Sequence, residues 1–142
     1  MLKGIPKVLS PLLVKVLMEM GHGDEIVLGD GNFPASSLGP TVVRADGHGV
    51  PALLEAILQL MPLDPYVARP VALMQVTPGD PVETPIWETY RSLLQADPKG
   101  GCIEEVERFA FYERARHAYA IVSTSETALY ANIILKKGVV TD

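Results

Sequence analysis

Two residues that could move protons flank a short apolar segment near the start of the chain. His22 lies between Gly21 and Gly23, and Asp30 follows the apolar run that ends at Leu28. An imidazole has an ordinary pKa of about 6.5, so it can exchange a proton near neutral pH, and a carboxylate can orient it or hold substrate hydroxyls. The pair therefore predicts acid–base chemistry, provided that both residues border one cleft, from different edges or from different subunits.

Phenol and amide groups further along the chain could recognise a substrate. Tyr112 lies in a segment rich in aromatic and charged residues, and Tyr130, Ala131 and Asn132 offer a phenol, a backbone N–H and an amide in succession. A tyrosine can stack on a sugar face or donate its hydroxyl, and an amide can bind hydroxyl groups. This combination favours a neutral polyol as the ligand.

Structural interpretations compete with the chemical ones. Asp30 precedes Gly31 and Asn32, where an Asx-turn would account for its carboxylate. His48 lies in a glycine-rich turn and His117 in a charged helical segment, where solvent exposure would explain both histidines.

The remaining charged and aromatic residues predict ordinary structural roles. We expect Asp24-Glu25 to be solvated charges at the start of a strand and Glu113-Arg114 to be a surface ion pair. Phe109 and Phe111 are expected in the hydrophobic core.

Charge and motif content exclude several classes of function. The net charge is −5, and Lys136-Lys137 is the largest cluster of basic residues, so a nucleic-acid-binding surface is not expected. The glycine pairs lack the spacing and the lysine of phosphate-binding loops, and no two histidines have metal-ligand spacing on one element. Ser36 and Ser37 lack the Gly-x-Ser-x-Gly pattern of a nucleophile elbow.

Cysteine use and hydropathy predict a soluble intracellular protein. Cys102 is the single cysteine, so an intramolecular disulfide is excluded and a reducing cytoplasm is expected. The N-terminal segment lacks the long apolar stretch of a signal peptide, and runs such as Val71–Met74 are too short to cross a membrane.

Hydrophobic periodicity and turn residues predict alternating strands and helices in a single domain, residues 1–142. Ser10 is a candidate N-cap before Pro11, and Gly21 a candidate stop after the first helix. The predicted helices cover 11–20, 51–61, 85–95 and 109–117, and residues 29–40 are expected to form a loop. The predicted strands cover 26–28, 41–45, 70–76, 103–107, 119–124 and 132–135. This alternation predicts an α/β fold, a central mixed sheet covered by helices on both faces, with site residues on loops at strand ends.

Six sequence blocks together resemble the L-fucose mutarotases, relatives of the D-ribose pyranases. The resemblance runs nearly end to end, and it is specific only for the blocks taken together. The blocks are Gly21-His-Gly-Asp-Glu-Ile26, Asn32-Phe-Pro-Ala-Ser36, Val43-Arg-Ala-Asp-Gly47, Pro62-Leu-Asp64, Arg108-Phe-x-Phe-Tyr-Glu-Arg-Ala115 and Tyr130-Ala-Asn-Ile-Ile-Leu-Lys-Lys-Gly138.

This resemblance implies an isomerase that interconverts sugar anomers without a metal or an organic cofactor. It also implies a cyclic homo-oligomer, a pentamer or decamer, with sites between adjacent subunits. His22 would be the catalytic proton-transfer residue. The residues implied to bind the monosaccharide, L-fucose, are Asp30, Asp64, Arg108, Tyr112, Tyr130, Ala131 and Asn132.

Branch-specific residues place the chain on the fucose side of the resemblance. Gly23 and Arg108 stand where ribose-type members usually carry threonine and histidine, and Phe-Tyr-Glu-Arg is absent from those members. Ala131 departs from the glycine common in the fucose branch, and its methyl group could alter the pocket. A D-ribose pyranase, a non-catalytic sugar-binding subunit and a purely structural oligomer remain the alternatives.

Overall fold

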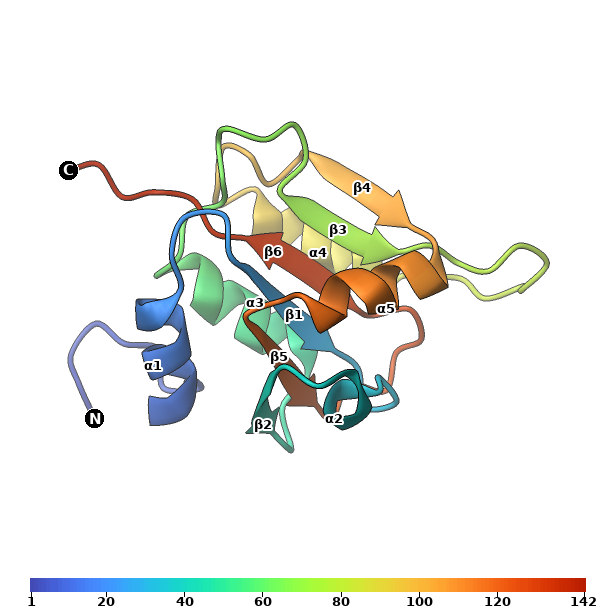
Figure 1. Ribbon diagram of the computed structural model, residues 1–142, viewed down its shortest axis with the longest axis horizontal. Coiled ribbons are helices and arrows are strands. Elements are labelled where there is room, and N and C mark those ends of the chain that lie inside the picture. Colours follow the sequence, from blue (N-terminus) through green and yellow to red (C-terminus); the bar gives the residue numbers. More distant parts are fainter.

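The computed structural model describes residues 1–142 and forms one six-stranded sheet with helices on both faces (Figure 1). The order of strands in the sheet is β2-β5-β1-β6-β3-β4. The strands are β1 (Glu25–Gly29), β2 (Thr41–Ala45), β3 (Val71–Met74), β4 (Ile103–Val106), β5 (Ala120–Thr124) and β6 (Ile133–Lys136). The helices are α1 (Pro11–Glu19), α2 (Ala35–Leu38), α3 (Val50–Leu58), α4 (Ile86–Leu94) and α5 (Arg108–Arg116). The expected α/β fold with a mixed sheet is confirmed.

Strand direction determines which loops meet. β6 is antiparallel to both of its neighbours, β1 and β3, whereas β5 runs parallel to β1 and to β2, and β4 parallel to β3. Five strands therefore point the same way, and their carboxyl ends share one edge of the sheet with the amino end of β6. The opposite edge holds the amino end of β1 and the carboxyl end of β6. Each predicted site residue belongs to one of these two edges.

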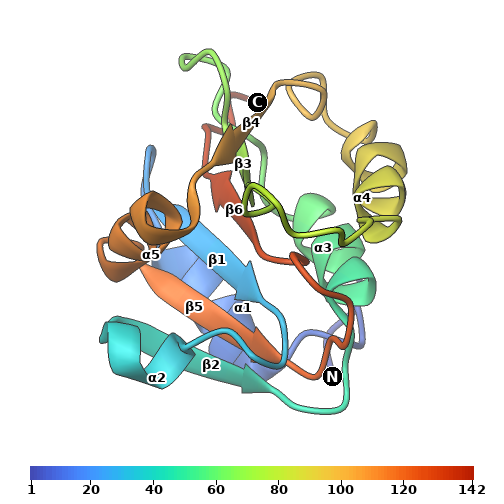
Figure 2. The same cartoon turned by 90° about the vertical axis from the view of Figure 1, so that its right-hand side faces the viewer.

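Alternating side chains along the strands build two separate cores. In β1, Ile26 and Leu28 pack with α1, α3 and α4, whereas Val27 packs with α2 and α5. Figure 2 shows α2 and α5 on one side of the sheet and α3 and α4 on the other. Because the central strands are buried on both faces, they read as continuous apolar runs in the sequence.

The ends of α1 are built from local interactions. Ser10 caps the helix as expected, because its Oγ accepts a hydrogen bond of 3.1 Å from the Leu13 N–H, and Pro11 occupies the first helical position. The expected stop at Gly21 is wrong in detail, since the chain leaves the helix at Met20, which has an extended conformation.

Four further expectations are corrected. The loop expected from 29 to 40 contains α2, a single helical turn that buries Ala35 and Leu38. Phe111 is fully buried, but Phe109 is 68% exposed, because it projects from the outer face of α5. Glu25 is not simply solvated and Arg114 does not pair with Glu113.

Arg114 instead bridges two carboxylates of the sheet. Its Nη2 lies 2.6 Å from Oε2 of Glu25 on β1, and its Nη1 pairs with Glu104 on β4. Their side chains are partly buried, and the pair with Glu25 raises the pKa of the Arg114 guanidinium. The network fixes α5 over the sheet, while Glu113 turns outward to Arg116 and His117. His117 is exposed, as expected.

No helix in the chain combines the length and the apolar character needed to span a membrane.

Candidate functional site

A cleft of about 290 Å³ with mixed polar and apolar lining lies at the sheet edge where the five carboxyl ends meet. It brings together five of the predicted binding residues, contributed by three different segments of the chain. Its lining residues are Asp30, Asn32, Phe33, Met74, Asp80, Arg108, Tyr112, Leu129, Tyr130 and Asn132. We call this the carboxyl-end cleft.

Asp30 forms the floor of the cleft directly after β1 and is only 6% exposed. Its backbone N–H donates to Oδ1 of Asn132 over 2.8 Å, and its Oδ1 accepts from the Asn32 N–H over 3.0 Å. The second contact is the expected Asx-turn, and Asp30 forms it while also lining the cleft. Burial raises the pKa of the Asp30 carboxyl above its ordinary value, against the opposing effect of backbone N–H groups led by that of Asn32.

Arg108 and Tyr112 line the cleft from the first turns of α5. They are four residues apart on the helix, and Nε of Arg108 donates to the Tyr112 hydroxyl oxygen over 3.1 Å. The guanidinium carbon also lies 5.3 Å from the centroid of the Phe109 ring. The hydrogen bond to Tyr112 raises the pKa of Arg108, so a fixed positive charge lies at the rim of the cleft.

Tyr130 reaches the cleft from the turn before β6. It is the one non-glycine residue with a positive φ, +53°. Its hydroxyl donates to Oδ2 of Asp80 over 2.7 Å. Asp80 was not predicted as a site residue: it lies in a proline- and glycine-rich loop after β3, and only its contact with Tyr130 reveals it.

The Ala131 side chain does not line the cleft. Its methyl group is fully buried in the core on the α3 and α4 side of the sheet, so the expectation that it alters the pocket is wrong. The Ala131 carbonyl accepts a hydrogen bond of 2.7 Å from the hydroxyl of Tyr90. Ala131 contributes backbone only, since its N–H lies against the Asp30 carboxylate and lowers that group's pKa.

His22 and Asp64 form a second cluster at the opposite edge of the sheet. Nε2 of His22 lies 3.0 Å from Oδ1 of Asp64, and the Tyr66 N–H donates to the same oxygen over 3.0 Å. The Tyr66 ring is 5.3 Å from the imidazole between centroids. The imidazole side chain is 45% exposed, whereas that of Asp64 is 4% exposed. We call these three residues the His22 cluster.

Two opposing effects act on the Asp64 carboxyl. Burial acts to raise its pKa, but the Tyr66 N–H and His22 outweigh burial, and the pKa lies below its ordinary value. The backbone of Asp64 is held by the edge of β6, where its N–H donates to the Lys136 carbonyl over 3.0 Å. The ionised carboxylate of Asp64, whose backbone is fixed by β6, therefore holds the exposed imidazole of His22 in place.

Strand β1 separates the His22 cluster from the carboxyl-end cleft within one chain. His22 precedes the strand and Asp30 follows it, and five strand residues at about 3.3 Å each span roughly 16 Å. A monosaccharide bound to Asp30 therefore cannot touch His22 of the same chain.

Known proteins resemble this chain over almost its whole length. A family profile described as the RbsD / FucU transport protein family matches residues 3–140. The chain belongs to the RbsD/FucU family. A Homo sapiens protein named fucose mutarotase is 54% identical over 147 residues, covering 97% of this chain and 94% of that protein. An Actinobacillus pleuropneumoniae protein named L-fucose mutarotase is 53% identical and covers 98% of this chain and 97% of its own.

A solved structure extends the likeness to three dimensions. The fucose mutarotase of Streptococcus pneumoniae in complex with L-fucose has a TM-score of 0.94 and 53% sequence identity to this chain. The match covers 99% of this chain and 100% of the other. RbsD/FucU membership, expected from six sequence blocks, is thus shown across the whole chain.

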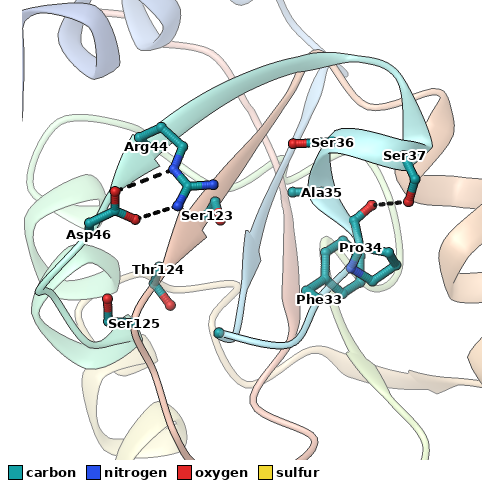
Figure 3. A pocket seen from close by; sticks show the side chains of 11 residues that line it. Phe33, Pro34, Ala35, Ser36, Ser37, Arg44, Asp46, Ser123, Thr124 and Ser125 are labelled. Atoms are coloured by element: carbon teal, nitrogen blue, oxygen red, sulfur yellow. Dashed lines mark hydrogen bonds and ion pairs between the residues drawn. The ribbon is translucent and has the colours of Figure 1, made fainter.

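This RbsD/FucU-family chain also has a second polar pocket beyond β2 and β5, which none of the predicted site residues lines (Figure 3). Arg44 and Asp46 pair across its mouth at 2.7 Å, and the Ser37 hydroxyl donates to the Pro34 carbonyl over 3.1 Å. Its charged groups therefore satisfy one another.

Proposed function

We propose that this protein is a mutarotase that interconverts the α and β anomers of L-fucose. The observation that carries the proposal is the carboxyl-end cleft, in which a carboxylate, an amide, a guanidinium and two phenols converge on one small space. These groups match the alternating hydroxyl donors and acceptors of a monosaccharide. The names of the human and bacterial relatives, and the L-fucose bound to the streptococcal one, support the same substrate.

We further propose that each site is shared by two neighbouring subunits of a cyclic homo-oligomer, a pentamer or decamer. The cleft has no imidazole, and the His22 cluster lies at the other end of β1, so a second copy would supply His22. Large apolar side chains beside both parts are exposed in the single chain: Tyr66 at 72%, Phe109 at 68% and Leu129 at 52%. A head-to-tail contact between copies would cover them.

In this arrangement His22 transfers the proton that opens the sugar ring. Breaking the bond between C1 and the ring oxygen requires a proton on that oxygen and removal of the proton of the C1 hydroxyl. The imidazolium of the neighbour's His22 would supply the first proton, and a positioned acid of this kind accelerates such a step by about 10²–10⁴-fold. Rotation about C1–C2 followed by the reverse transfers closes the other anomer. Asp30 and Asn132 would hold sugar hydroxyls, and no cofactor is required.

Saturation transfer between the anomeric protons of L-fucose tests the proposal. We expect the protein to accelerate exchange of L-fucose above the uncatalysed rate, and to do so more strongly than exchange of D-ribose. Faster exchange on D-ribose would favour the pyranase alternative. Tight binding of L-fucose without faster exchange would instead indicate a binding subunit.

We also propose that the enzyme is cytoplasmic, because a single cysteine is typical of proteins in a reducing compartment.

A further inference from the structure

His22 lies in a tight turn between α1 and β1. The Asp24 N–H closes the turn by donating to the Gly21 carbonyl over 3.1 Å, and Oδ2 of Asp24 accepts from the Gly21 N–H over 2.7 Å. Gly23 occupies the position of the turn that requires a positive φ, +87°. These local hydrogen bonds shape the turn, but they do not attach it to the rest of the protein.

The backbone of Lys137, the residue directly after β6, attaches the turn to the sheet. The Lys137 N–H donates to the Asp24 carbonyl over 2.9 Å, and the Lys137 carbonyl accepts from the Gly23 N–H, also over 2.9 Å. These two bonds extend the antiparallel pairing of β1 with β6 by one residue beyond Glu25. The segment between α1 and β1 accordingly lies beside the segment that follows β6 (Figure 1). The chain next to His22 is therefore held by the register of the sheet.

The side chain of Lys137 holds the other end of the same turn. Its ammonium donates to the Leu17 carbonyl over 2.8 Å and to the Met20 carbonyl over 2.5 Å. Both carbonyls lie at the carboxyl end of α1, where backbone acceptors lack partners within the helix and carry partial negative charge. An ammonium has three donors and no acceptor, so it is well matched to a pair of carbonyls. Lys137 thus contacts the chain on both sides of His22.

The two neighbours of Lys137 hold the segment that carries Asp64. The Lys136 carbonyl accepts from the Asp64 N–H over 3.0 Å, and the Gly138 N–H donates to the Pro62 carbonyl over 2.8 Å. A Cβ at Gly138 would lie 2.5 Å from a carbonyl oxygen of that segment, so glycine is needed for the close approach. The three residues after Leu135 therefore set the distance between the imidazole and its carboxylate.

We propose that Lys137 is a positioning residue of the mutarotase, and that its ammonium and backbone together fix the turn that presents His22 to the sugar bound by the neighbouring copy. This inference rests on the proposed function. The imidazole is about half exposed, and Asp64 contacts it through Nε2 alone, so the orientation of the ring also depends on its backbone. Lys137 acts through His22 and contacts no reacting atom.

Removal of the ammonium tests this role without removing the backbone bonds. Lys137→Met keeps the aliphatic stem of the side chain, and Lys137→Arg keeps a cation with several donors. Ser10→Ala is the matched control, because it removes the cap at the other end of the same helix, α1, and leaves the turn of His22 intact. A role in stabilising α1 alone would therefore affect Lys137→Met and Ser10→Ala alike.

We expect Lys137→Met to lower the exchange rate constant at saturating L-fucose by about 10- to 100-fold, because misplacement of a reacting group by about 1 Å has effects of that order. The Kd for L-fucose should change by less than about threefold, since Lys137 does not line the carboxyl-end cleft. Lys137→Arg should restore most of the rate, and Ser10→Ala should keep the full rate. Backbone amides of residues 20–24 should exchange hydrogen faster in Lys137→Met than in Ser10→Ala.

The full rate in Lys137→Met, or an equal loss in Ser10→Ala, would overturn the role of Lys137 and leave the proposed function in place. A loss of L-fucose binding as large as the loss of rate, or a change of oligomeric state on size-exclusion chromatography, would also overturn it. If Lys137→Met does not fold, Lys137→Gln takes its place with the same expectations, because it also lacks the ammonium. A wild type without accelerated exchange would instead remove the proposed function itself, and this inference with it.

Discussion

Asp64 holds His22 through a 3.0 Å contact between Oδ1 and Nε2, and the buried carboxylate lies behind an imidazole that is about half exposed. The pairing leaves Nδ1 of the ring as the nitrogen available to a substrate. Because the backbone of Asp64 is held by β6, the imidazole is oriented by the sheet and not by a mobile loop.

The first prediction concerns His22. His22→Gln should abolish accelerated anomer exchange, because glutamine cannot carry a proton, while folding and L-fucose binding stay largely intact because the side chain is exposed. Saturation-transfer NMR and isothermal titration measure the two properties. His117→Gln is the matched control, since His117 is exposed at the end of α5 and pairs there with Glu113 on the surface. Unchanged exchange in His22→Gln would remove His22 from the mechanism.

The second prediction concerns Asp64 and stability. Asp64→Ala leaves the Tyr66 N–H and His22 without their acceptor and should lower the free energy of unfolding by about 1–3 kcal/mol at neutral pH. The pKa of Asp64 is lowered in the folded protein, so the linked part of this stability is present above the ordinary value of 3.8 and is lost as the pH falls through the folded pKa. Urea unfolding at fixed protein concentration, over a series of pH values, measures the difference. A difference that grows toward acid would contradict the assignment.

The third prediction concerns Asp30, whose contribution to stability should change with pH in the opposite direction to that of Asp64. Burial raises the folded pKa of Asp30, so its protonated form stabilises the fold, and that contribution is lost as the pH rises from 3.8 through the folded pKa. Relative to Asp30→Asn, which does not titrate, the wild type should lose stability across this window and plateau above it. The same urea titrations test this expectation. Parallel pH profiles for the two proteins would show that burial does not perturb Asp30.

The fourth prediction concerns the network that fixes α5. Arg114→Met leaves the partly buried carboxylates of Glu25 and Glu104 without a cation and should destabilise the protein by about 2–4 kcal/mol. Arg116→Met is the control: its partner is Glu113 on the surface, and the change should stay within about 0.5 kcal/mol. Equal effects of the two substitutions would mean that the buried network contributes no more than a surface pair.

The sequence was most informative where local physics dominates. The apolar runs that became β1, β3 and β5 and the serine cap of α1 follow from periodicity and from backbone hydrogen bonding. Helix α2 was not predicted, because a single turn between Pro34 and Gly39 is too short to show a helical period in the sequence. All four longer helices and all six strands were expected, with boundaries that differ by a few residues.

Long-range contacts were the part that could not be predicted. Glu25 and Arg114 are 89 residues apart in the sequence, and Tyr130 and Asp80 are 50 apart. Neither contact produces a periodic pattern in the sequence from which it could be predicted. Phe109 and Phe111 are two positions apart on a helix, hence on different faces, and only the packing of α5 decides which one is buried. Most candidate residues were predicted from residue type and spacing, and Asp64 and Arg108 from the family resemblance, whereas their division between two sheet edges follows from the strand directions.

Mixing two inactive variants tests the shared site most directly. His22→Gln retains an intact cleft and Asp30→Asn an intact His22 cluster, so each alone should be inactive. If sites form head-to-tail between copies in a ring, subunits unfolded together in equal amounts and refolded should regain about a quarter of the wild-type exchange rate, because one interface in four pairs two intact halves. Exchange that stays at the level of the separate variants, in refolded oligomers shown to contain both chains, would contradict the account.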